Sequence, residues 1–151
     1  MFRGFFIDLY FCIEWRLTGV LMKILTMITA ISGFVGVALG AFGTHGLRGT
    51  VDPELLFVWQ TAMQYQMFHV LVLLSIIIAG SRQSNRFLTI SGWLFVAGTV
   101  LFSGSLYALV ITGIKSLGMV TPFGGVLFLL GWLVLSFALV RFINAQQVTA
   151  E

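Results

Sequence analysis

Long apolar stretches separated by short polar links run along most of the chain, and this pattern predicts four membrane-spanning helices. The apolar stretches cover residues 24–42, 53–80, 87–111 and 122–140. A helix of about 20 residues crosses the roughly 30 Å hydrocarbon core of a bilayer and satisfies its backbone hydrogen bonds internally. The expected fold is therefore all-α, an integral membrane four-helix bundle.

Residues at the ends of these stretches agree with separate helices. Asp52 can cap free amide groups, Pro53 suits the first helical position, and Glu54 is favourable near the positive end of the helix dipole. Gly113 lies where a terminating glycine is common, and Pro122 opens the fourth stretch. These signals support the bounds of the second, third and fourth helices.

Composition makes lipid the solvent for most of the chain. Hydrophobic residues make up 59% of the sequence and charged residues 9%, against about 45–50% and about 25% in soluble domains. The net charge of +3 comes from basic residues scattered over separate links, so they form no basic patch. The bilayer is therefore the expected partner, and nucleic acid is not.

The distribution of lysine and arginine predicts the orientation. With four crossings, Arg48 and Lys115 lie on one side of the membrane. The other side holds six basic residues, which are Arg3, Arg16, Lys23, Arg82, Arg86 and Arg141. Because basic loops resist translocation, the N- and C-termini are expected to be cytoplasmic. Residues 22–141 would then form the transmembrane domain and residues 142–151 a cytoplasmic tail.

Residues 1–21 form an amino-terminal extension with two interpretations. Aromatic and aliphatic side chains surround four charged residues there, so the segment is too short and too charged to span. One interpretation is an interfacial helix on the cytoplasmic leaflet. The other is a mis-called translation start, because Met22-Lys23 resembles a natural beginning.

Small residues predict close helix packing at two places. Ser32, Gly36 and Gly40 recur every four residues and share one face of the first helix. Gly124 and Gly125 follow the start of the fourth helix, where close packing is also expected. We favour a helix of the same chain over a second copy as the partner of the first stripe, although such stripes serve both.

Polar side chains inside the second and third helices are the main candidates for function. Polar groups in lipid are costly unless paired, and ionisable ones often mark functional sites. His69 would lie about 12–18 Å deep at a rise of about 1.5 Å per residue. The side chains that we expect around a central polar cavity are Tyr65, Gln66, His69, Ser103, Ser105 and Tyr107. A neutral histidine bonded to a serine or a tyrosine is the structural alternative.

The sequence predicts neither an enzyme nor a bound metal or cofactor. His45, in the glycine-rich first outer loop, is a candidate outer-loop site, but its depth differs too much from that of His69 for both to bind one metal ion. The single cysteine, Cys12, excludes an internal disulfide framework and a cysteine-based metal site within one chain. Apart from Glu54 at the very start of the second helix, no membrane segment carries an acidic residue, and no hydrolase motif is present.

Four motifs in order resemble the YgdD/YwdK family of small bacterial inner-membrane proteins of unknown function. They are residues 40–45 (GAFGTH), 65–69 (YQMFH), 101–107 (LFSGSLY) and 121–125 (TPFGG) with Gly131-Trp132. The resemblance covers about residues 22–140 and implies four crossings of the bacterial cell inner (plasma) membrane. It implies no activity, and the extension lies outside the pattern.

Two hypotheses for function follow. The first is a non-enzymatic multipass protein, a structural or accessory subunit that forms a homo-oligomer or joins another membrane protein, whose polar residues specify packing. The alternative is a small transporter, channel or cofactor-binding bundle with a polar cavity around His69.

Overall fold

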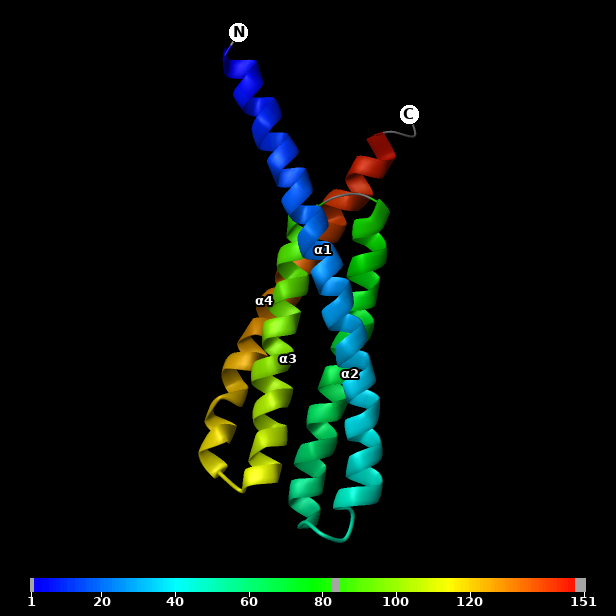
Figure 1. Ribbon diagram of the computed structural model, residues 1–151, viewed down its shortest axis with the longest axis vertical. Coiled ribbons are helices and arrows are strands. Elements are labelled where there is room, and N and C mark those ends of the chain that lie inside the picture. Colours follow the sequence, from blue (N-terminus) through cyan, green and yellow to red (C-terminus); the bar gives the residue numbers. More distant parts are fainter. Residues whose placement is uncertain (1, 83–84, 149–151) are drawn as a thin grey trace.

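The computed structural model describes residues 2–82 and 85–148, with side chains described for residues 16–81 and 85–141. The described chain is helical almost throughout (Figure 1). Its elements are α1 (Phe2–Phe42), η1 (Gly43–Leu47), α2 (Pro53–Arg82), α3 (Arg86–Thr112), η2 (Lys115–Met119) and α4 (Thr121–Val148). Each of the four long helices contains a span apolar enough to cross a membrane, so the predicted four-helix membrane fold is confirmed.

The four long helices pack in chain order, with each one against the next. Among the described residues, α3 packs along both α2 and α4, while α2 and α4 flank it without close backbone contact. The start of α1, the end of α2, the start of α3 and the end of α4 lie at one end of the molecule, and η1 and η2 lie at the other (Figure 1). The two termini therefore share one side of the membrane.

The largest difference from the expected bounds is at the amino end. α1 runs without a break from Phe2 to Phe42, whereas we expected a helix over residues 24–42 preceded by a separate extension. Residues 2–21 continue along the direction of α1 (Figure 1). Both interpretations of residues 1–21, an interfacial helix and a mis-called start, stay predictions.

The other helix ends lie close to the predicted positions, apart from the end of α4. Gly113 ends α3 with a φ of 72°, and its N–H donates to the carbonyl oxygen of Leu109. Asn85 caps the start of α3, because its side-chain oxygen accepts from the N–H of Phe87 at 2.9 Å. α4 continues to Val148, so part of the expected tail is helical.

Glycines allow two of the helix pairs to approach closely. A Cβ atom at Gly36 would lie 2.5 Å from the sulfur of Met67, and one at Gly40 would lie 3.7 Å from Met63, so this stripe faces α2 of the same chain. A Cβ atom at Gly124 would lie 2.8 Å from the Cα atom of Phe102, which brings the backbones of α3 and α4 together. These contacts bring α1 against α2 and α3 against α4.

Candidate functional site

The six polar side chains that we expected around one cavity lie in three places. Tyr65 and Gln66 are consecutive, and consecutive residues of an α-helix point about 100° apart. Gln66 therefore points toward α1 and α3, while Tyr65 and His69 line a groove toward α4. The structure separates what the sequence had grouped.

The first group forms a closed hydrogen-bond network between α1, α2 and α3. The Nε2 atom of Gln66 donates to the carbonyl oxygen of Ser32 at 2.8 Å, and the hydroxyl of Tyr107 donates to Oε1 of Gln66 at 3.0 Å. The hydroxyl of Ser103 donates to the carbonyl oxygen of Ala62 at 2.8 Å. These side chains are buried and bonded to one another or to backbone, so they specify how the helices pack.

Trp59 supports this network from the side of η1. Its ring packs edge-on against that of Tyr107, with 4.6 Å between centroids, and its N–H donates to the carbonyl oxygen of Leu39 at 2.9 Å. Ser105 stands apart from the network, because its hydroxyl lies 2.8 Å from that of Thr121 and joins α3 to the start of α4. Neither Ser105 nor Tyr107 reaches the groove that contains His69.

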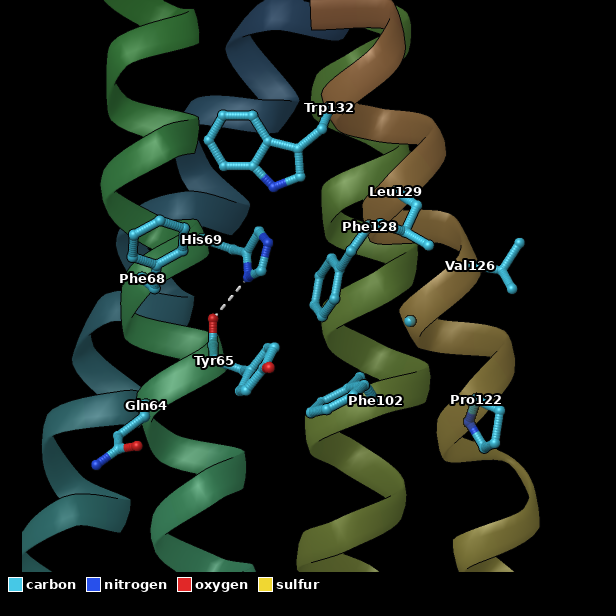
Figure 2. Close-up of a pocket in the computed structure, with 11 residues that line it drawn as sticks. Gln64, Tyr65, Phe68, His69, Phe102, Pro122, Val126, Phe128, Leu129 and Trp132 are labelled. Carbon is cyan, nitrogen blue, oxygen red and sulfur yellow. Dashed lines mark hydrogen bonds between the residues drawn. The ribbon is translucent and has the colours of Figure 1, made fainter.

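A groove opens between α2 and α4 (Figure 2). It encloses about 730 Å³. Phe68, Val126 and Leu129 are each more than half exposed along its rim, so it is open at the lipid-facing surface. Its lining residues are Gln64, Tyr65, Phe68, His69, Phe102, Pro122, Gly125, Val126, Phe128, Leu129 and Trp132. Gly125, which we expected in helix packing, has no side chain and therefore widens this groove.

His69 places one unpaired polar atom against the groove. The side chain is 3% exposed, and its Nδ1 atom lies 2.8 Å from the carbonyl oxygen of Tyr65. A carbonyl oxygen can only accept, so Nδ1 carries the hydrogen, and Nε2 of a neutral ring is left as an acceptor. Nε2 is buried and has no hydrogen-bond partner. An unpaired buried polar atom costs about 1–3 kcal/mol, so this arrangement needs an explanation.

Aromatic rings surround the imidazole on several sides. The ring of Phe128 stacks on it, with centroids 3.7 Å apart and planes within 4° of parallel. Phe68 and Phe95 contact its other sides at centroid distances of 5.4 and 5.3 Å. Trp132 lies against both phenylalanines, and Figure 2 shows the nitrogen edge of its indole turned toward the imidazole. Aromatic side chains therefore enclose the imidazole, and an indole N–H lies near its unpaired acceptor.

Tyr65 lines the groove next to Phe102 of α3. Its ring stacks on that of Phe102, with centroids 4.5 Å apart, and the side chain is 44% exposed. Tyr65, His69 and Phe128 lie roughly parallel, because the interplanar angles of Tyr65 with His69 and Phe128 are 25° and 23°. The groove is thus lined by aromatic rings of similar orientation.

His45 lies far from this groove. It is exposed in η1, at the end of the bundle opposite the chain termini. Among the residues that the structure describes, no group of three histidine, cysteine, aspartate or glutamate side chains is placed to hold a metal ion. The two histidines therefore belong to separate environments.

Sequence reasoning missed most of the groove, because its walls are aromatic. Phe102, Phe128 and Trp132 read as lipid-facing or core residues in an apolar stretch. Trp132 appeared only as part of a matching motif. A possible signal was the concentration of aromatic residues near His69 on both α2 and α4, but assigning them to one site needs the pairing of helices.

Comparisons with known proteins identify the family. Residues 39–125 match the family described as "Protein of unknown function (DUF423)". The UPF0382 membrane protein SAB0533 of Staphylococcus aureus is 47% identical over 122 residues, which are 80% of this chain and 98% of that protein. The UPF0382 membrane protein YwdK of Bacillus subtilis is 43% identical over 123 residues, which are 81% of this chain and 100% of YwdK.

These matches confirm the resemblance found in the motifs. No solved structure matches this chain. These relatives are named as membrane proteins, which agrees with the four apolar helices of this chain that are long enough to cross a bilayer. This chain is therefore a multipass membrane protein that belongs to the DUF423 family, together with YwdK and the other UPF0382 membrane proteins.

Proposed function

We propose that this protein is a non-enzymatic binding protein of the bacterial plasma membrane, with its termini in the cytoplasm. Its groove between α2 and α4 would hold a membrane-dissolved molecule that carries a hydroxyl group on a flat ring. The observation that carries the proposal is the buried, unpaired Nε2 atom of His69 beside a groove of about 730 Å³. Lipid tails offer no donor to such an atom, whereas a hydroxyl group does.

The chemistry of the groove supports this class of ligand. A hydroxyl can donate to Nε2 of His69 and also accept from the indole N–H of Trp132 (Figure 2). The roughly parallel rings of Tyr65, His69 and Phe128 offer an aromatic surface against which a flat molecule in the groove can pack. Trp132 is 39% exposed, so the indole reaches from the site to the lipid-facing surface. Entry from the bilayer needs no water-filled path.

The same residues support binding rather than catalysis. Besides His69, the polar residues that line the groove are Tyr65 and Gln64. Its lining includes no aspartate, glutamate, lysine, arginine or cysteine. Acid–base or nucleophilic catalysis generally uses a second group within hydrogen-bond reach of the histidine.

The excess of lysine and arginine on the side of the termini supports the proposed orientation, and the Staphylococcus and Bacillus relatives support a bacterial plasma membrane. Scattered basic residues support lipid, not nucleic acid, as the partner.

A pair of probes tests the need for a hydroxyl donor. The purified protein in detergent is titrated with 1-naphthol and with 1-methoxynaphthalene, which has the same ring system but cannot donate, and binding is followed by fluorescence. We expect 1-naphthol to bind about tenfold more tightly, because the methoxy compound leaves Nε2 unpaired. The His69→Phe variant should bind both probes alike.

Tyr65→Phe is the matched control, because it changes a hydroxyl on the same groove but leaves Nε2 in place. It should keep the preference for 1-naphthol. Equal binding of the two probes by the unaltered protein would reject the proposal. That result would favour the second candidate, a structural or accessory subunit or homo-oligomer, which the closed network of Gln66 and Tyr107 supports.

A further inference from the structure

A second site lies at the end of the bundle that holds the chain termini, where α1 crosses the beginning of α3. A pocket of about 380 Å³ opens there between α1, the end of α2 and the start of α3. Its lining residues are Thr18, Gly19, Met22, Lys23, Thr26, Ile77, Gly80, Ser81, Asn85 and Thr89. Unlike the aromatic groove, this pocket combines one cation with several hydroxyl and amide groups.

Two unpaired polar atoms lie along the same part of α3. The hydroxyl of Thr89 and the indole nitrogen of Trp93 are both buried without a hydrogen-bond partner, and Thr89 is only 5% exposed. The residues are four apart and therefore share one face of the helix. They also line one shallow apolar pocket with Leu21, Ile90 and Leu94, and Thr89 belongs to both pockets. A polar ligand at Thr89 can thus extend into an apolar channel beside Trp93.

The depth of these groups matches the order of groups in a phospholipid. Lys23 and Asn85 lie near the start of α3, at the level where a charged side chain meets headgroups. Thr89 and Trp93 follow at roughly 4.5 and 10 Å along α3 from Arg86, given a rise of about 1.5 Å per residue. A phospholipid presents first a phosphate, then ester carbonyl oxygens, then acyl chains. The polar groups of the protein, from Lys23 and Asn85 to Thr89 and Trp93, follow the same order along the bundle.

We propose that an anionic phospholipid binds at this seam between α1 and α3. Lys23 and the amide of Asn85 contact its phosphate, Thr89 and Trp93 donate to its ester carbonyl oxygens, and the acyl chain follows Ile90 and Leu94 into the hydrocarbon. Asn85 can serve in this way, because its oxygen already caps α3 and its NH₂ group remains a donor. This lipid site is independent of the groove that contains His69.

Native mass spectrometry of the full chain with added lipid tests the ester contact. Ester-linked dioleoyl phosphatidylglycerol is compared with its ether-linked analogue, which lacks the carbonyl oxygens. We expect the protein to bind the ester lipid about fivefold more tightly, because the ether lipid leaves the Trp93 N–H unpaired. Trp93→Phe, which keeps an aromatic ring, should remove this preference, and Thr89→Val should reduce it.

A second comparison tests the charge. Lys23→Gln should lower the preference for phosphatidylglycerol over phosphatidylcholine with the same acyl chains by about fivefold. Lys115→Gln is the matched control at the opposite end of the bundle, and it should leave that preference unchanged. Equal binding of ester and ether lipids by the unaltered protein would overturn the proposal, and so would an equal effect of the two lysine variants. His69→Phe should alter neither lipid preference.

Discussion

Both faces of α2 carry a buried polar residue, but only one of these residues has all its polar side-chain atoms hydrogen-bonded. On the face toward α1 and α3, Gln66 is buried and bonded to both neighbouring helices. On the face toward α4, His69 is equally buried, yet its Nε2 atom is unpaired and adjoins an open groove. One face uses its polar group to specify packing, while the other keeps a polar atom available. This difference separates a structural role from a binding role within a single helix.

The largest effect on stability is expected from breaking the hydrogen-bond network that Gln66 forms with α1 and α3. Gln66→Leu removes the acceptor of Tyr107 and the donor to Ser32, so we expect a loss of about 2 kcal/mol in the free energy of unfolding. Gln64→Leu is the matched control, because Gln64 is exposed beside the groove. The free energy can be measured by unfolding in mixed micelles with increasing dodecyl sulfate. Similar losses in both variants would remove the distinction between the two faces.

On the face of α2 toward the groove, replacing the buried polar residue should raise the free energy of unfolding instead of lowering it. His69→Phe keeps a flat ring that can stack on Phe128 and removes the unpaired Nε2 atom, whose cost of about 1–3 kcal/mol exceeds the loss of about 0.5–1.5 kcal/mol for the Nδ1 hydrogen bond to Tyr65. We therefore expect the ligand-free protein to gain about 1 kcal/mol of stability. The same unfolding measurement checks this, with Tyr65→Phe as a control of small effect. A clear loss of stability in His69→Phe would show that the histidine belongs to the packing and not to a ligand site.

The sequence predicted the helices better than the site. Apolar stretches of membrane length and Gly113 at the end of α3 are local signals, and the structure agrees with them. The separation of Gln66 from His69 depends instead on which helices flank α2, because a residue spacing of three or four groups side chains only on an isolated helix. Trp132 illustrates the same limit, since an aromatic residue in lipid and one in a groove have the same sequence signal.

A smaller effect is expected at the indole that faces His69. Trp132→Phe keeps an aromatic ring but removes the N–H that would donate to the ligand hydroxyl. Because His69 still accepts from that hydroxyl, we expect 1-naphthol to bind only about threefold more weakly, with little change for 1-methoxynaphthalene. The two fluorescence titrations measure this directly. An equal loss of affinity for both probes would mean that Trp132 contributes only apolar contact. The ligand hydroxyl would then bond to His69 and not to Trp132.

The smallest effect on stability and binding is expected at His45. This variant compares an exposed polar group with the buried ones. His45 is exposed in η1, outside the groove and the closed network. His45→Asn should therefore change the free energy of unfolding by less than about 0.5 kcal/mol, as is usual for surface positions. It should also leave the preference for 1-naphthol over 1-methoxynaphthalene intact. If this variant lost that preference while keeping its stability, the ligand would have to enter past η1 rather than from the bilayer, and the lipid-facing rim of the groove would no longer explain access to His69.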